Sequence, residues 1–429
     1  MTRHPVVPLA VPVLPELDRI LGPRVVTRLS DLAEASTDFG RLYRRRPLAV
    51  VRPAGPHQLA QVCRLAHDHG VPVVPRGAGH STEGLCLAPG GIVVDTRHLS
   101  SVESYVDPRG EHLLSARAGA RWRDVVGHTL PGGLIPPVLP DYLGLTVGGT
   151  LAAGGFSGAT QHFGSQADTV RELEVVTPAG ELVTCSAQTH PDLFDAVRGG
   201  SGRHGIITRA VLPLRRAPSR RLWLRLGHDS PEAALQSQFR ALDGRFTHLE
   251  GMVRRTGDGW RFTTDALLDL DLDDELDLDV AAGELVSDLG GELDDVRVTP
   301  FPDWLFRFDA VEQQQRADGS WHRRHPRCTV VLPGRHAAAI VRRTLDGLSG
   351  SLLGAGGSIL LYAFPTHRLE APGVARAADP YSVLFGLQRT APGGDREVLD
   401  AMRRANAELV ATARRVGGSP YPRAAGPDD

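Results

Sequence analysis

The fold is most constrained by a Gly-rich turn between two short apolar runs. Val71–Val74 and Gly91–Asp95 are typical of buried strands. Between them, Arg76–Ser81 reads RGAGHS, and its two glycines let the backbone turn tightly and offer free N–H groups to an anion such as a pyrophosphate. Pro75 favours strand–loop–strand over the strand–loop–helix of a GxGxxG motif. These residues alone leave open a phosphate-binding turn or an ordinary Gly-rich connection.

Two further Gly-rich stretches follow. Pro140–Gly155 reads PDYLGLTVGGTLAAGG, and Asp192–Thr208 reads DLFDAVRGGSGRHGIIT. In this order, the three motifs resemble the FAD domain of the FAD-binding PCMH-type flavoproteins, the superfamily of vanillyl-alcohol oxidase and berberine bridge enzyme. PDYLGLTVGGTL followed by VVTPAGELVTCS resembles the cytokinin dehydrogenases in particular. The resemblance is strong over Arg44–Pro218 and fainter beyond.

The resemblance implies an α+β protein with two domains. A two-lobed PCMH-type FAD-binding domain would occupy residues 1–218, with its core at 44–218, and Arg215–Pro218 is typical of a boundary. An α+β substrate or cap domain with an antiparallel sheet would occupy 219–429. It would end in a helix at 395–416 and a short tail; whether the tail returns toward the FAD domain is left open.

Hydrophobic periodicity and turn residues predict the main elements. The pattern at Pro15–Gly40 indicates a helical lead-in, and Leu113–Val126 indicates a strand passing into a helix. Further strands are expected at Leu48–Arg52, Thr169–Val176, Glu181–Ser186, Gly205–Leu214, Leu222–Leu226, His248–Arg255, Cys328–Leu332 and Ile359–Phe364. Further helices are expected at Pro56–His69, Pro191–Arg198, Pro231–Leu242 and His336–Leu348.

Composition excludes several classes of protein. All 48 basic residues are arginine, which excludes a Schiff-base lysine and the lysine of a Walker loop. A net charge of −2 and few aromatic residues give no reason to expect a nucleic acid or an anionic membrane as partner. The four cysteines are scattered, which is typical of reduced thiols. Prolines interrupt the apolar N-terminus, so we expect a cytoplasmic protein without a signal peptide or membrane span.

His80, within RGAGHS, is the candidate cofactor anchor. By spacing alone it would be a solvated loop histidine, whereas the resemblance implies FAD bound covalently through its 8α-methyl group, which raises the flavin potential. Some relatives carry a second, cysteinyl link, but GGLIPPVLPDYLG has no cysteine, so one bond is expected. The resemblance assigns cofactor contacts to Pro75, Gly77, Ala78, Gly79, His80, Ser81, Leu85, Asp141, Thr146, Ala152, Phe156 and Ile207.

Two carboxylates are the catalytic candidates. Asp141 follows Pro140 and could be a simple turn residue, but it matches the carboxylate that bonds the substrate N–H in cytokinin dehydrogenases. Removing hydride from a carbon beside an amine nitrogen leaves cationic character, which a carboxylate stabilises or relieves by taking the N–H proton. Glu250 matches a substrate-contacting glutamate of the family; an exposed strand carboxylate is the alternative.

Two other patterns suggest metal binding, but neither is interpreted as a metal site. His322, His325 and Cys328 have a spacing that suggests zinc, but no second ligand pair lies nearby, so no metal is expected. Asp265–Asp279 alternates leucine with aspartate and lacks the glycine and terminal glutamate of an EF-hand. We expect this run to form a solvated edge or helix face.

The C-terminus departs from the family pattern. Cytokinin dehydrogenases carry an L-x-P-G-Q pattern after the last helix, whereas this sequence reads PYPRAAGPDD. Leu369 also falls where the family often has a pocket tryptophan. We therefore expect the tail Gly417–Asp429 to be frayed, the flavin edge to be more open, and cytokinin turnover to be weak.

The leading hypothesis is an FAD-dependent dehydrogenase or oxidase that removes hydride next to an amine nitrogen. Its partners would be a small-molecule amine and an electron acceptor, either oxygen or a quinone. Two alternatives remain: an alcohol or sugar oxidase of the same fold, and a flavin-binding protein that has lost turnover. Asp141 favours the first hypothesis.

Overall fold

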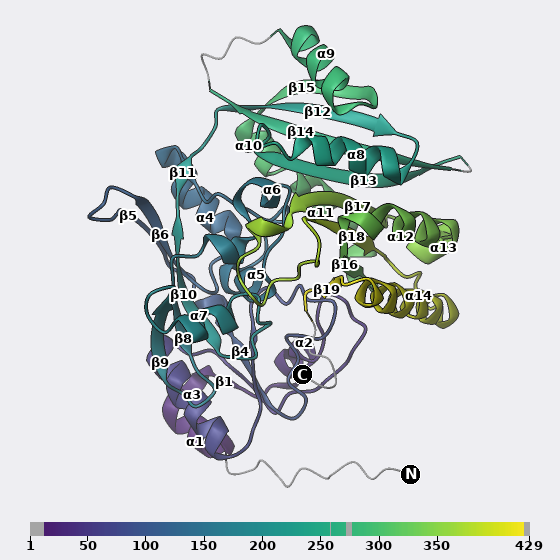
Figure 1. The fold of residues 1–429 in the computed structure, drawn as a ribbon. Coiled ribbons are helices and arrows are strands. Elements are labelled where there is room, and N and C mark those ends of the chain that lie inside the picture. The colour runs from purple at the N-terminus through teal and green to yellow at the C-terminus, as the bar shows by residue number, and fades with distance from the viewer. Residues whose placement is uncertain (1–12, 258, 272–276, 424–429) are drawn as a thin grey trace.

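The computed structural model describes residues 13–257, 259–271 and 277–423. Figure 1 shows two parts, which we call the N-terminal part (residues 13–216) and the C-terminal part (residues 220–423). Each is built from helices and sheets, so the predicted α+β fold class is confirmed. Among the described residues, no helix is both long and apolar enough to cross a membrane.

The first lobe of the N-terminal part carries the Gly-rich turn. Its sheet has the order β1–β2–β4–β3, and β2 and β3 both run parallel to β4. The predicted strand–loop–strand is therefore present, although the helical lead-in is divided into two helices and a strand. The elements are α1 (Val13–Leu21), β1 (Val25–Val26), α2 (Leu29–Ala35), β2 (Ala49–Val51), α3 (Pro56–Asp68), β3 (Val73–Arg76) and β4 (Ile92–Asp95).

The second lobe carries the other two Gly-rich motifs. Its antiparallel sheet has the order β5–β6–β10–β8–β9. The second motif, predicted only as a Gly-rich stretch, folds into the short helix α5; a Cβ at Gly148 would lie 2.6 Å from the Cβ of Ala118, so the glycine lets the helix pack closely. The elements are β5 (Val102–Val106), β6 (His112–Arg117), α4 (Trp122–Thr129), β7 (Leu134–Ile135), α5 (Val147–Ala153), α6 (Thr160–Phe163), β8 (Glu172–Val176), β9 (Leu182–Ser186), α7 (Pro191–Val197), β10 (Ile206–Pro213) and β11 (Arg215–Arg216).

The C-terminal part is an antiparallel sheet with the order β15–β12–β14–β13–β17–β18–β16–β19. Its strands are β12 (Arg220–His228), β13 (His248–Thr256), β14 (Gly259–Leu270), β15 (Glu292–Pro300), β16 (Cys328–Pro333), β17 (Ser358–Pro365), β18 (Tyr381–Gln388) and β19 (Ser419–Tyr421). Its helices are α8 (Pro231–Ala241), α9 (Leu278–Leu289), α10 (Phe301–Leu305), α11 (Phe308–Ala317), α12 (Gly334–Asp346), α13 (Gly350–Leu353) and α14 (Arg396–Arg415).

The alternation of side chains along β16, β17 and β18 places this sheet between two layers. Val330, Leu361 and Phe385 point into a core shared with α8, α12 and α14. Their neighbours Tyr362 and Leu384 point the other way, into a cluster that includes residues of the N-terminal part. One face of the sheet is thus covered by helices, and the other face is turned toward the N-terminal part (Figure 1).

The interpretation of Asp265–Asp279 as a solvated edge or helix face is wrong for its first residues. Residues up to Leu270 belong to β14, which lies inside the sheet between β12 and β13. Asp265 is 4% exposed and accepts hydrogen bonds from Trp223 Nε1 (2.8 Å) and Arg225 Nε (2.6 Å). Facing arginines on β12 satisfy the buried aspartates, which no local pattern could reveal. Residues 272–276 lie outside the described residues.

The prediction of a frayed, open tail is also wrong up to residue 423. Ser419–Tyr421 form β19 at the sheet edge, paired with β16. Tyr421 Oη accepts a hydrogen bond from Gly155 N (3.2 Å), and Ser201 Oγ donates one to the carbonyl of Arg423 (2.9 Å). Prolines suit an edge strand because only one side of it is paired. The segment therefore returns to the N-terminal part; residues 424–429 lie outside the described residues.

Candidate active site

The Gly-rich turn after β3 packs directly against the second motif. A Cβ at Gly77 would lie 2.1 Å from Thr146 Oγ1, so only glycine allows this approach. Gly79 has a φ of +70°, a conformation that glycine adopts without strain. Thr146 immediately precedes α5 and lies beside the turn. The fold thus brings together two motifs that are about 60 residues apart in the chain.

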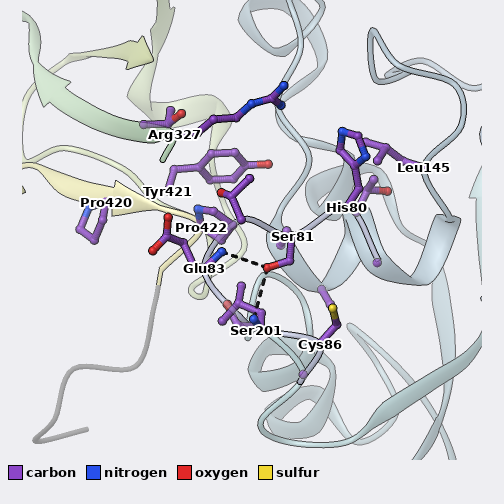
Figure 2. A pocket seen from close by; sticks show the side chains of 18 of the residues that line it. His80, Ser81, Glu83, Cys86, Leu145, Ser201, Arg327, Pro420, Tyr421 and Pro422 are labelled. Carbon is purple, nitrogen blue, oxygen red and sulfur yellow. Dashed lines mark hydrogen bonds between the residues drawn. The ribbon is translucent and has the colours of Figure 1, made fainter. Parts of the chain in front are cut away.

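A cavity of about 910 Å³ lies against both motifs. This volume is near the upper end of the ~300–1,000 Å³ of small-molecule sites. Strands β16, β17 and β18 contribute Thr329, Tyr362 and Leu384 to its wall, and β19 contributes Tyr421. Figure 2 shows His80, Arg327 and Tyr421, from distant parts of the chain, around this one space.

All twelve residues predicted to contact the cofactor line this cavity. They are Pro75, Gly77, Ala78, Gly79, His80, Ser81, Leu85, Asp141, Thr146, Ala152, Phe156 and Ile207. The fold therefore gathers the predicted residues in one place, and their contact with FAD stays a prediction. Glu250 does not line the cavity wall, but its carboxylate lies within 4.8 Å of that of Asp141.

His80 presents an unbonded imidazole to the cavity. Within the described chain, no hydrogen bond engages its ring nitrogens, and its ring stacks on Phe39 at a centroid distance of 3.9 Å. Burial lowers the pKa of His80 to about 3, and the neighbouring Arg327 and His325 lower it further in the same direction. At neutral pH the ring is therefore uncharged and can act as a nucleophile.

Asp141 lies at the centre of a charged cluster. Arg307 Nη2 donates a hydrogen bond to Asp141 Oδ1 (2.6 Å) and lies 3.6 Å from Glu250 Oε1. His248 Nε2 lies 2.9 Å from the same Glu250 oxygen. The structure thus places the two predicted catalytic carboxylates together, and the exposed-strand alternative for Glu250 is wrong, because its side chain is only 22% exposed.

The environment of Asp141 shifts the pKa of its carboxyl toward neutral pH. Burial raises the pKa of Asp141 to about 7, and the charge of Glu250 adds to the rise, whereas Arg307 and His248 oppose it. The side chain of Asp141 is 29% exposed and lines the cavity. Burial, with Arg221 and Arg307, holds the pKa of His248 well below its usual value. A carboxyl that titrates near neutral pH suits a general base.

The cluster already contains a cation. One ligand atom each from Asp141, His248 and Glu250 lie within 4.8 Å of one another, a spacing that a metal ion could bridge. The guanidinium of Arg307 contacts both carboxylates, however, and supplies the positive charge that a metal would bring. Among the described residues, His322, His325 and Cys328 form no such group.

Sequence reasoning missed several neighbours of these groups. Arg307 lies between α10 and α11, where Trp304 supports its guanidinium at 3.9 Å from the ring centroid. Arg327 lines the cavity beside His80, and its Nε is buried without a hydrogen-bond partner in the described chain. Among 48 arginines, no local motif distinguishes these two. Only the fold shows that they face ionisable groups.

The residues present fit FAD. Glycine residues leave room for close approach at the turn, and the Arg327 guanidinium lacks an anionic partner among the described residues. Burial lowers the pKa of Arg327 to about 10, so it remains protonated at neutral pH. An unpaired cation in a partly buried position is costly unless an anion balances it. A dinucleotide carrying a pyrophosphate supplies such charge.

Comparison with known proteins supports the same cofactor. Residues 47–186 match the model of an FAD binding domain. The chain is 34% identical over 394 residues to the "Uncharacterized oxidoreductase ORF5 in fasciation locus" of Rhodococcoides fascians, covering 91% of this chain and 87% of that protein. It is 34% identical over 441 residues to cytokinin dehydrogenase 5 of Oryza sativa subsp. japonica, covering 92% and 82%.

The fold is similar to that of a solved flavoenzyme. Xylooligosaccharide oxidase from Myceliophthora thermophila aligns with a TM-score of 0.74 over 97% of this chain and 91% of that one, at 19% identity. This likeness concerns the fold, whereas the sequence identities establish descent. The predicted resemblance is thus confirmed: the chain belongs to the FAD-binding PCMH-type flavoproteins, is homologous to the cytokinin dehydrogenases, and is an FAD-dependent oxidoreductase.

Proposed function

We propose that this protein oxidises a small-molecule amine by removing hydride from the carbon next to its nitrogen. The observation that carries the proposal is the position of Asp141: a carboxyl on the wall of the cofactor cavity, with a pKa of about 7. The names of the cytokinin dehydrogenase relatives support the same chemistry.

The Gly-rich turn and the N-terminus of α5 would hold FAD, with His80 as its covalent anchor. The bound cofactor supplies the hydride acceptor. The neutral, unbonded imidazole of His80 supports the covalent link, because a protonated ring could not form the bond. The absence of cysteine from the segment before Asp141 supports a single link.

Asp141 would act on the amine itself. As hydride leaves, the nitrogen becomes cationic, and the ionised carboxylate stabilises it or accepts the N–H proton. Arg307 keeps the carboxylate oriented through the 2.6 Å hydrogen bond. Glu250, 3.6 Å from the same guanidinium, does not line the cavity and would instead set the charge around Asp141.

An anaerobic substrate panel tests the proposal. The purified flavoprotein is mixed with secondary amines, including isopentenyladenine, and separately with alcohols and oligosaccharides, and flavin bleaching is followed in the visible spectrum. The proposal predicts bleaching by amines. Bleaching only by alcohols or sugars would support the oxidase alternative, and a flavin that no compound bleaches would support lost turnover.

The electron acceptor is a separate part of the proposal. Oxygen and a quinone are the two candidates. After anaerobic reduction by a competent amine, the reduced protein is mixed with air-saturated buffer or with a soluble quinone. The faster reoxidation identifies the acceptor, and failure of both would reject this part alone.

A further inference from the structure

A segment preceding the residues that match the FAD-binding model is bonded to the Gly-rich turn. Phe39 N donates a hydrogen bond to the carbonyl of Gly79 (2.9 Å), and Gly40 N donates one to the carbonyl of Ser81 (3.0 Å). These two bonds lie on either side of His80. A side chain at Gly40 would come within 2.6 Å of the Thr82 backbone, so the segment lies flush against the turn.

Two further bonds fix the same segment. Arg76 Nη1 donates to the carbonyl of Thr37 (2.8 Å), and Asp38 Oδ2 accepts from Gly84 N (2.8 Å). Residues 37–40 therefore bind the turn before, at and after its histidine. We call residues 37–40 the strap.

The ring of Phe39 stacks with two imidazoles. His80 is stacked on it at a centroid distance of 3.9 Å and an interplanar angle of 22°. His325 is stacked on it at 4.3 Å and 4°. Trp321 meets Phe39 edge-on at 4.9 Å, and Tyr142 lies 5.0 Å from His80. The His80 imidazole thus has aromatic neighbours from three other parts of the chain.

The C-terminal part completes this arrangement. His325 N donates a hydrogen bond to the carbonyl of Gly40 (2.9 Å), and the guanidinium of Arg327 lies over Phe39 at 4.9 Å. The imidazole of His325 is held in turn by Thr390, whose Oγ1 lies 3.3 Å from Nδ1. Docking of the C-terminal part therefore supports the strap, and through it the orientation of His80.

We propose that Phe39 is the positioning residue that holds the His80 imidazole in place for covalent attachment of FAD. This inference rests on the covalent link of the proposed function. Attachment breaks one C–H bond of the 8α-methyl group and one imidazole N–H bond and forms a C–N bond. Two protons leave to solvent, and two electrons pass through the flavin to the acceptor that reoxidises it in turnover, oxygen or a quinone.

The physical reason is confinement. A histidine in a loop samples several rotamers, whereas stacking against Phe39 restricts the His80 ring to few orientations at the cavity wall. Holding two reacting groups at the correct distance and orientation contributes a large part of the rate of a bond-forming step. The low pKa of His80 keeps the confined ring uncharged in the same environment.

The test measures covalent attachment directly. Apoprotein from riboflavin-depleted cells is incubated with FAD and the acceptor, and the acid-precipitated pellet is assayed for yellow colour over time, alongside the total bound flavin. Phe39→Leu is expected to slow attachment by about tenfold or more while total bound FAD stays the same. Phe39→Tyr, which keeps the ring, is expected to attach FAD at close to the wild-type rate.

Phe163→Leu is the matched control. Phe163 also packs against a histidine, His162 at 4.5 Å, but that histidine does not line the cavity as His80 does, so the variant should attach FAD normally. If Phe39→Leu does not fold, His325→Leu removes the outer ring of the stack, and slowing by about threefold is expected. If Phe39→Leu, or His325→Leu in its place, folds and attaches FAD at the wild-type rate, this inference alone is overturned. A colourless wild-type pellet would also overturn the covalent link.

Discussion

His80 and Asp141 face the same cavity, but the protein holds them in different ways. The turn around His80 is fixed by backbone hydrogen bonds from residues about 40 positions earlier and by stacked rings. Asp141 is fixed by charged side chains, and its main partner, Arg307, is 166 residues away. A turn held by backbone hydrogen bonds suits the covalent link proposed for His80, whereas charged side chains suit the change of protonation proposed for Asp141.

The largest expected effect is the loss of covalently bound flavin when His80 in the Gly-rich turn is replaced. His80→Ala removes the only histidine in the turn, so the acid-precipitated pellet should lose its yellow colour completely, while the cavity can still bind FAD without a covalent bond. Visible spectra of the pellet and of the native protein check both statements. Colour that persists in the variant pellet would show that another residue carries the link.

The next largest effect concerns the charged side chains around Asp141, and it is tested by replacing Arg307. Because Arg307 lowers the pKa of Asp141, Arg307→Gln should raise it by about one to two units. If the ionised carboxylate is required, the wild-type rate of flavin reduction rises with pH through about 7. In the variant this rise should move to higher pH, with a reduction rate about tenfold lower at pH 7.

Arg225→Gln serves as control, because Arg225 pairs with Asp265, away from the cavity. Stopped-flow reduction between pH 5 and pH 9 gives both profiles. A profile of Arg307→Gln that matches the wild type would show that Arg307 does not act through Asp141.

Replacing Glu250 should shift the pKa of Asp141 in the opposite direction and by a smaller amount. Its negative charge raises the pKa of Asp141, so Glu250→Gln should lower that pKa by about one unit or less. The rise in flavin reduction should therefore occur at lower pH than in the wild type. The same stopped-flow series decides the sign, and a shift to higher pH would contradict the electrostatic role given to Glu250.

The smallest effect concerns β19, the C-terminal strand that contacts the N-terminal part through Tyr421. Tyr421→Phe removes the hydroxyl that accepts the hydrogen bond from Gly155 N, which should lower the free energy of unfolding by about 1 kcal/mol. Thermal unfolding of the apoprotein at one fixed pH measures the change. Tyr381→Phe, at a side chain that is 38% exposed, is the control and should have a smaller effect.

These two regions also differ in how far the sequence predicts them. The strand–turn–strand at RGAGHS follows from local patterns, because apolar runs and glycines dictate the backbone themselves. All twelve residues to which the resemblance assigned cofactor contacts also lie on one cavity. Asp141 and Glu250 were identified through resemblance, whereas Arg307 was not, because nothing near it in the chain indicates which carboxylate it meets.

The errors have the same physical origin. The aspartates of β14 were expected in solvent because their arginine partners lie on β12, some 40 residues earlier. The tail was expected to fray because its Pro- and Gly-rich composition gives no local stability, yet it pairs with β16. Long-range pairing, which composition does not encode, decides both cases.

The most direct test of the central claim is the reduction of bound flavin by a competent amine in wild type and in Asp141→Asn, measured anaerobically in a single turnover. The substitution keeps the shape of the side chain but removes its charge and its ability to take a proton. The account predicts reduction slower by ~10²-fold or more, with FAD content unchanged. An unchanged reduction rate with full FAD content would contradict the role of Asp141 and, with it, the proposed mechanism.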